Sequence, residues 1–182
     1  MAHGDLPAGA GAGTLVAIFA SPVAEHLLHF GHELGYRTVL VEPDAAQLTP
    51  ALRRGPHEVL TDVPATDGPA PNVVVTDHDR PELGDLLATV LSGPTRWVGV
   101  MGSPRHSAPH VAALRERGVA AADVARVHRP IGLNIGSHTP AEIAIATLAG
   151  LIADRNGRPG GFFAGAGDQG GPGTASAEPP SS

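Results

Sequence analysis

Short runs of β-branched and aliphatic residues alternate with longer segments of helical periodicity, and this alternation constrains the fold more than any other feature. The runs predict strands at 14–19, 37–42, 72–76 and 96–101. Because they are apolar almost throughout, each predicted strand should be covered by helices on both faces. The alternation therefore predicts a doubly wound α/β fold, in which a mostly parallel sheet lies between two helical layers.

Helices are predicted between and after these strands, at 22–34, near 81–91, at 104–117 and at 140–155. The first repeats apolar residues at spacings of four, three and four, and Gly35 ends it. The segment 45–71 contains five prolines and predicts a short helix, a brief strand and a surface loop.

The chain has 182 residues, a length that suits one α/β domain. We expect this domain to span 14–158. Residues 1–13 and 159–182 are rich in glycine, alanine, proline and serine. Both are expected to be disordered tails, because they cannot bury enough apolar surface to offset chain entropy.

Charge and composition exclude several classes of function. The 12 Lys and Arg against 18 Asp and Glu give a formal charge of -6, so there is no broad cationic surface for nucleic acid. The absence of cysteine excludes disulfides, thiolate metal ligands and a cysteine nucleophile. The sequence has no signal-peptide pattern, and no apolar run approaches the ~20 residues of a membrane span. We therefore expect a cytoplasmic protein without membrane contact.

Three predicted helices begin with the same pair of residue types. Ser21, Ser103 and Thr139 are each followed by proline, which places a hydroxyl at the N-cap and proline at the first helical position. Glu142 completes a capping box with Thr139. In a parallel sheet these junctions follow the carboxyl ends of the strands, where open α/β sheets bind ligands and helix N-termini attract anions. We expect the ligand site at this edge, although each junction alone is more typical of ordinary helix capping.

Two glycine-containing segments lie at the same edge. Gly102 and Ser103 precede Arg105, which combines close backbone approach, a hydroxyl and a guanidinium where a phosphate or another anion would fit. The alternative there is plain turn chemistry. The second segment, 129–139, is typical of a loop that wraps a ligand, and its alternative is a rigid Ω-like turn. Its polar and glycine residues are Gly132, Asn134, Gly136 and Thr139.

The first strand-to-helix turn is where a dinucleotide fingerprint belongs. Glu42 follows about twenty residues later, at the place of a ribose-binding carboxylate. The glycines of that fingerprint are replaced by FASPVA, and Phe19 and Pro22 obstruct the close approach that a pyrophosphate needs. NAD(P) binding in the ordinary manner is therefore disfavoured. Binding of a nucleotide in a different manner remains an open alternative.

Four polar residues, TDHD at 76–79, follow a predicted strand and could hold a hard cation or act as acid and base. They converge only if the strand has already ended, and Asp79 is otherwise the N-cap of the next helix. His26, His29 and His32 recur at every third position. Because no carboxylate-anchored zinc pattern occurs, we interpret these histidines as solvent-exposed and predict no metal site.

The chain contains WVGVMGSPRH at 97–106, RVHRPIGLNIGSHTPAEIAIATLAGLIADRNGR at 126–158 and, more loosely matched, FASPVAEHL and VVVTDHD. These segments resemble the C-terminal domain of the XdhC/CoxI family, accessory proteins for maturation of xanthine dehydrogenase and related molybdenum hydroxylases. The resemblance implies a Rossmann-like, three-layer α/β/α domain over 14–158. It also implies binding of the molybdenum cofactor, its protection and its delivery to the apoenzyme.

A molybdenum-cofactor chaperone without a reaction of its own is therefore the leading hypothesis, and whether the chain is an enzyme remains open. Ser103, Arg105 and the helix N-termini would hold the molybdopterin phosphate. The partner would be a hydroxylase subunit, or a separate protein carrying the family's cysteine-containing domain, which does not occur in this sequence. A homodimer remains open. The cofactor-binding candidates are Ser21, Glu42, Gly102, Ser103, Arg105, Gly132, Asn134, Gly136 and Thr139.

Two other functions remain open. An NAD(P)-dependent oxidoreductase would use Glu42 on the ribose and His78 or Asp79 as proton donor or base, and no other catalytic residue is indicated. A scaffold would dock to a hydroxylase subunit without holding cofactor.

Overall fold

A parallel sheet forms the centre of the computed structural model, which describes residues 12–64, 68–102 and 108–161. Within these residues the sheet has six strands in the order β3-β2-β1-β4-β5-β6, and every neighbouring pair is parallel. Chain order reverses between β1 and β4, which is the point where doubly wound sheets bind ligands. The strands are β1 (Thr14–Ile18), β2 (Arg37–Val41), β3 (Glu58–Leu60), β4 (Asn72–Val75), β5 (Trp97–Val100) and β6 (Val127–His128).

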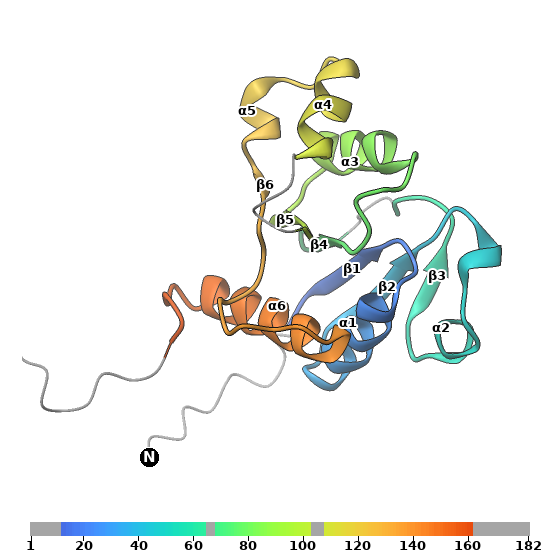
Figure 1. Ribbon diagram of the computed structural model, residues 1–182, viewed down its shortest axis with the longest axis vertical. Coiled ribbons are helices and arrows are strands. Elements are labelled where there is room, and N and C mark those ends of the chain that lie inside the picture. The colour runs from blue at the N-terminus through green and yellow to red at the C-terminus, as the bar shows by residue number, and fades with distance from the viewer. Residues whose placement is uncertain (1–11, 65–67, 103–107, 162–182) are drawn as a thin grey trace, which may run out of the picture.

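Helices cover both faces of the sheet (Figure 1). The two longest, α1 (Pro22–Glu33) and α6 (Pro140–Arg155), pack side by side on one face. On the other face α3 (Leu83–Ser92) packs against α4 (Pro109–Glu116), and α5 (Ala121–Val124) follows. The 3-10 turn η1 (Ala45–Gln47) and α2 (Pro50–Arg54) connect β2 to β3. The predicted doubly wound α/β fold, with its mostly parallel sheet, is confirmed.

Alternate residues of the central strands supply the two halves of the core. Val16 and Ile18 point into the cluster that α3 completes, whereas Leu15 and Ala17 point into the cluster formed with α1 and α6. All four are at most 1% exposed. This two-sided burial is why the predicted strands read as continuous apolar runs instead of alternating ones.

All four predicted strands are present, and each ends one residue earlier than predicted. The residue beyond the strand nevertheless continues the ladder, because its N–H donates to the neighbouring strand at 2.8–3.0 Å. These donors are Phe19 to Val41, Glu42 to Leu60, Thr76 to Ile18 and Met101 to Val75. The predictions of α1 and α6, and of a short helix and brief strand within 45–71, are also confirmed.

The predicted start of the 104–117 helix is wrong. Helix α4 begins at Pro109, and its N-cap, Ala108, has no side-chain capping bond. A helix running from residue 104 would hold Pro109 in its interior, where the ring clashes with the preceding turn and the missing N–H removes a hydrogen bond. At the first helical position the same proline costs nothing. Ser103 and Pro104, the predicted cap and first residue, lie outside the described residues.

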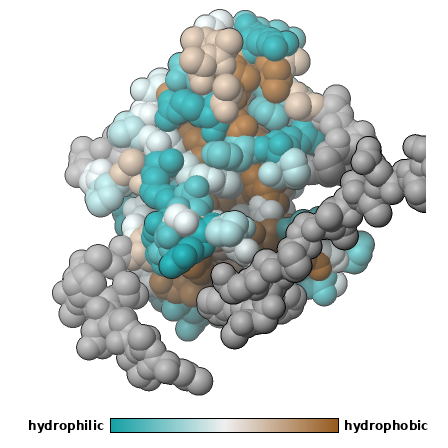
Figure 2. Space-filling view, turned by 90° about the vertical axis from the view of Figure 1, so that its left-hand side faces the viewer, coloured by the Kyte–Doolittle hydropathy of each residue, from teal (hydrophilic) through white to brown (hydrophobic). Residues whose placement is uncertain are grey.

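Most of the two predicted tails, 1–13 and 159–182, also lies outside the described residues. Within the described ranges, none of the helices has the length and apolarity needed to span a membrane. Seen from the side of β6 and α6, hydrophilic residues cover much of the surface, and hydrophobic patches lie between them (Figure 2).

We predict that Leu28→Ala lowers the free energy of unfolding by about 2–5 kcal/mol, because it leaves a cavity in a fully buried site between α1 and the sheet. Leu34→Ala is the matched control. Leu34 caps the same helix but is 46% exposed, so its loss should stay within about 0.5 kcal/mol. Chemical denaturation measures both, and equal losses would contradict the assigned core.

Candidate functional site

A groove of about 700 Å³ lies where β4 and β5 end. Its walls come from four parts of the chain: the first turn of α1, the residues after β4 and β5, the loop before α6 and the first turn of α6. It is therefore at the carboxyl edge of the sheet, beside the reversal of strand order, as the sequence predicts. The lining residues are Val23, Thr76, His78, Met101, Gly102, residues 130–137 and Ile143.

The loop 129–139 forms one side of the groove and rests on α6. Gly132 has a φ of +85° and lies so close to the helix that an added Cβ would be 3.1 Å from the Ala146 carbonyl carbon and the Thr147 nitrogen. Leu133 donates its N–H to the Ala146 carbonyl at 3.0 Å, and Gly150 on the helix faces Gly132. Both the positive φ and the close approach require glycine at residue 132. The loop thus has a fixed position over the helix.

The N-termini of α1 and α6 border the groove through Val23 and Ile143. Ser21 accepts a hydrogen bond from the Ala24 N–H at 3.0 Å, and Pro22 follows it. At α6 the Thr139 hydroxyl accepts from the Glu142 N–H at 3.3 Å. The predicted N-caps at residues 21 and 139 are therefore confirmed.

Glu142 closes the predicted capping box from the other side. Its Oε2 accepts the N–H groups of His138 at 2.8 Å and Thr139 at 2.9 Å. These two hydrogen bonds lower the pKa of Glu142 below its ordinary value, because they favour the charged carboxylate. The capping box fixes the junction between the groove loop and α6.

The side chains of the segment 76–79 do not converge on one point. The Thr76 hydroxyl donates to the carbonyl of Phe19 at 2.7 Å, and Asp77 accepts the N–H of Asp79 at 3.0 Å. His78 lines the groove, whereas the side chain of Asp79 is 85% exposed. The alternative reading of Asp79 as a helix cap is wrong, because α3 begins four residues later with Glu82 at its N-cap.

Glu42 lies at the end of β2 and is only 1% exposed. Its carboxylate accepts the N–H of Ala20 at 2.7 Å and that of Asp44 at 2.9 Å. The guanidinium of Arg80 binds both oxygens, at 3.2 and 3.0 Å. Burial opposes the charge of Arg80, but the hydrogen bonds and charges of Glu42 and Glu82 outweigh it and raise the pKa of Arg80. In this arrangement the polar contacts of Glu42 are made within the protein.

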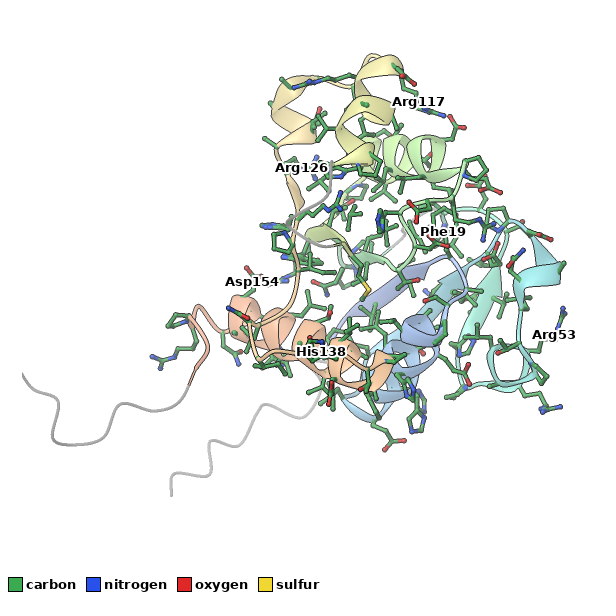
Figure 3. All side chains as sticks on the ribbon, in the orientation of Figure 1. Phe19, Arg53, Arg117, Arg126, His138 and Asp154 are labelled. Atoms are coloured by element: carbon green, nitrogen blue, oxygen red, sulfur yellow. The ribbon has the colours of Figure 1, made fainter. Side chains whose placement is uncertain are left out.

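Phe19 occupies the turn where a dinucleotide fingerprint would place its first glycine. It has a φ of +76°, a conformation that few residues with a side chain adopt, and it is completely buried. The guanidinium of Arg80 lies 4.8 Å from the centre of its ring. Figure 3 shows Phe19 near the middle of the molecule, in contrast to Arg53 and Arg117 at its periphery. The turn after β1 is therefore filled by protein side chains.

The structure brings some of the predicted site residues together and separates others. Four predicted cofactor-binding residues and His78 line the groove. Ser21 and Thr139 are the N-caps of the two helices that border it. Glu42 lies away from this lining. Ser103 and Arg105 lie outside the described residues. The four groove residues are Gly102, Gly132, Asn134 and Gly136.

Three residues at this edge were not selected from the sequence. Arg80 follows the acidic run 76–79, and a cation directly after such a run is a signal for an ion pair. Arg129 opens the glycine-containing loop, next to the cis bond to Pro130, and a Cβ on Gly102 would collide with its guanidinium. His110 is 3% exposed, and as an isolated histidine near a helix start it gave no signal.

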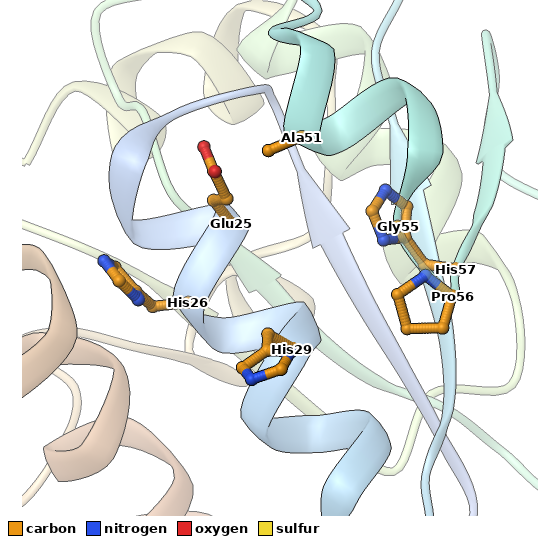
Figure 4. Close-up of a pocket in the computed structure, with 7 residues that line it drawn as sticks. All are labelled: Glu25, His26, His29, Ala51, Gly55, Pro56 and His57. Atoms are coloured by element: carbon orange, nitrogen blue, oxygen red, sulfur yellow. The ribbon is translucent and has the colours of Figure 1, made fainter.

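A second cavity, of about 270 Å³, lies between α1 and the end of α2 (Figure 4). Glu25, His26 and His29 line it from α1, and His57 lines it from the other side. His29 and His32 are exposed, as predicted, and His26 is half-buried against Phe30. In the described part of the chain, no three His, Asp or Glu side chains come together in a way that could hold a metal ion.

Comparison with known proteins identifies relatives of the chain. The family model described as the XdhC Rossmann domain matches residues 15–151. The uncharacterized protein YqeB of Escherichia coli K12 is 39% identical over 91 residues, which are 50% of this chain and 16% of that protein. A crystal structure described as a xanthine dehydrogenase from Bacillus halodurans has a TM-score of 0.64 at 23% identity, over 80% of this chain and 45% of that one. This structural likeness shows the shared fold, and the chain spans less than half the length of both relatives.

We predict that Glu42→Gln lowers the free energy of unfolding by about 3–5 kcal/mol, because it removes the buried carboxylate that binds both ends of the Arg80 guanidinium and leaves Arg80 with only the partly exposed Glu82. Glu58→Gln is the matched control. Glu58 also pairs with an arginine, at 2.6 Å, but both side chains are exposed, so its loss should be below about 1 kcal/mol. Denaturant unfolding at pH 7 measures both, and similar losses would show that Glu42 is not a structural anchor.

We predict that Glu142 makes stability depend on pH. Because its pKa is lowered in the folded protein, its contribution is fully present above its ordinary value near 4.5 and is lost as the pH falls through the folded value. The difference in Tm between the wild type and Glu142→Gln should therefore be largest near pH 6 and narrow toward pH 3. A difference that stays constant across this range would contradict the assigned capping box.

Proposed function

The chain belongs to the XdhC Rossmann domain family, and on this premise we propose that it binds the molybdenum cofactor in the groove and serves as an accessory protein for a xanthine dehydrogenase or a related molybdenum hydroxylase. Family membership supports the accessory role. The groove itself is the observation that supports this binding site. It brings residues of the segment 126–158, which resembles the family, next to the residues that follow β4 and β5.

The groove suits a ligand that combines a flat ring system with an anionic group. Its volume of about 700 Å³ is within the range of small-molecule sites, which are mostly apolar with a few placed polar groups. Its apolar lining residues, which suit the pterin ring, are Val23, Met101, Pro130, Ile131, Leu133, Ile135 and Ile143.

Polar groups and glycines lie between these apolar side chains. Asn134 and the backbone of Gly132 and Gly136 offer hydrogen bonds along the loop. The N-termini of α1 and α6 border the groove and favour a phosphate group. When bound, the cofactor carries the molybdenum and dithiolene chemistry that the hydroxylase uses. The residues of this chain would hold it, orient it and restrict its access to solvent.

The other two functions lead to different expectations. In an NAD(P)-dependent oxidoreductase Glu42 would bind the ribose, but its carboxylate is buried and engaged by Arg80. This arrangement favours the accessory function. A scaffold would dock to the hydroxylase without using the groove. Three partners remain proposals: a hydroxylase subunit, a separate protein with the cysteine-containing domain, and a second copy of this chain. A cytoplasmic location is also a proposal.

We predict that anaerobic calorimetric titration of the purified chain detects binding of molybdopterin or the complete cofactor, with NADH and CTP as comparison ligands. Asn134→Trp should weaken this binding at least tenfold, because the indole would fill the groove from an exposed position. Asn156→Trp is the matched control, since Asn156 is exposed at the opposite end of α6.

The outcomes of this titration separate the three functions. Preferential binding of NADH would favour the oxidoreductase. Absence of binding for every ligand, together with retained capture of a hydroxylase subunit, would favour the scaffold. Cofactor binding that is equally strong in both tryptophan variants would place the site away from the groove.

A further inference from the structure

His78 is the one titratable side chain among the described residues that line the groove, and the proposed function does not use it. Its side chain is 28% exposed, so most of the ring is enclosed. The one polar contact of the ring within the described ranges is with Asp79, whose carboxylate lies 3.7 Å from Nε2. This distance is too long for a hydrogen bond. The imidazole therefore lines the groove with its hydrogen-bonding capacity unused.

The residues on both sides of His78 are held by contacts with the rest of the protein. Before it, the Thr76 hydroxyl donates to the carbonyl of Phe19 at 2.7 Å. After it, the guanidinium of Arg80 binds both carboxylate oxygens of Glu42. Both ends of this loop are therefore fixed, one to the turn after β1 and the other to the residue that follows β2.

Asp77 fixes the backbone at His78 itself. Its Oδ1 accepts the N–H of Asp79 at 3.0 Å, and this bond closes a turn of the Asx type with His78 at its centre. The turn restricts the backbone of the residue that it encloses and so limits the directions that the imidazole can take. A side chain presented from a fixed backbone binds a ligand with a smaller loss of conformational entropy.

The surroundings of the ring favour an uncharged partner. No Asp, Glu, Lys or Arg is among the described lining residues. The Asp79 carboxylate, 3.7 Å from Nε2, disfavours a second anion beside His78 and favours the tautomer that carries its proton on Nε2. In that tautomer Nδ1 is an acceptor. The complementary ligand group is therefore an uncharged N–H.

We propose that His78 determines the specificity of the groove, by accepting a hydrogen bond at Nδ1 from an N–H on the edge of the ligand's heterocyclic ring. Asp77 is a positioning residue that holds His78 through the turn. The pyrimidine ring of a pterin has such N–H groups, whereas a hydrocarbon ring and a phosphate do not. The inference deepens the proposed function and rests on it for the identity of the natural ligand, but the ring contact can be tested separately.

The experiment titrates the full chain with pterin and with quinoxaline and measures both affinities by NMR. Quinoxaline is a fused bicycle of similar shape that lacks N–H groups. The wild type should prefer pterin, and His78→Phe should weaken pterin binding about three- to tenfold, the range for one neutral hydrogen bond, without weakening quinoxaline binding. His78→Asn should recover most of this loss, because the amide oxygen can replace Nδ1 as acceptor. His32→Phe is the matched control, since His32 is exposed on α1 and does not line the groove.

A double-mutant cycle tests the role of Asp77. Asp77→Ala should weaken pterin binding in the wild type but have little further effect in His78→Phe, because the turn acts through the ring. Amide NMR spectra of the free variants establish that each is folded. Additive losses would show that Asp77 acts independently of His78 and would overturn its positioning role.

The remaining outcomes separate this inference from the proposed function. Equal losses for pterin and quinoxaline in His78→Phe would overturn the inference, because the loss would not depend on N–H groups. Weaker binding of inorganic pyrophosphate in the same variant would place an anion at His78 and overturn it too. Cofactor binding without pterin binding would overturn the inference and leave the proposed function standing. Pterin binding with the expected losses, but without cofactor binding, would support the ring contact and overturn the proposed function.

Discussion

The buried ion pair between Glu42 and Arg80 is the interaction on which the arrangement of the carboxyl edge depends. Glu42 directly follows β2, accepts the N–H of Ala20 from the turn after β1, and binds Arg80 from the segment before α3. One carboxylate thus joins three connections that leave the sheet at neighbouring strands. Removing Arg80 would leave the buried carboxylate of Glu42 without a cation, and removing Glu42 would leave Arg80 with Glu82 alone. Breaking a buried pair in this way is destabilising.

This pair also determines which part of the edge remains open. Arg80 covers Phe19, and Phe19 fills the turn where a dinucleotide would approach the backbone. The open space lies instead on the other side of the strand reversal, after β4 and β5, where the groove is found. A fold with the strand order of a nucleotide-binding domain has therefore filled the turn after β1 and left a groove after β4 and β5.

The opposite wall of the groove depends on close packing between backbones. The contact of Gly132 with α6, the hydrogen bond from Leu133 to Ala146, and the capping box at Thr139 together fix the loop at both of its ends. These contacts explain why a loop that is rich in glycine has a defined course. Gly132 faces the helix, whereas Asn134 lines the groove.

Much of this architecture could be predicted because the local signals agreed with one another. Apolar runs identified the four central strands, and serine or threonine followed by proline identified the starts of α1 and α6. The same signal failed at Ser103, because a second proline at residue 109 sets the start of α4. The two-residue strand β6 and the four-residue helix α5 gave no signal, since elements this short depend on tertiary contacts.

The sequence by itself determined the parallel α/β fold, the starts of α1 and α6 and the family to which the chain belongs. These follow from periodicity, capping and segments of consecutive residues, all of which are local properties. Only the tertiary structure decided that Glu42 is paired internally with Arg80, and that the residues after β4 and β5 line one groove together with the loop before α6. The physical reason is that burial and electrostatic interaction depend on distances between residues far apart in the chain, and no local pattern specifies those distances.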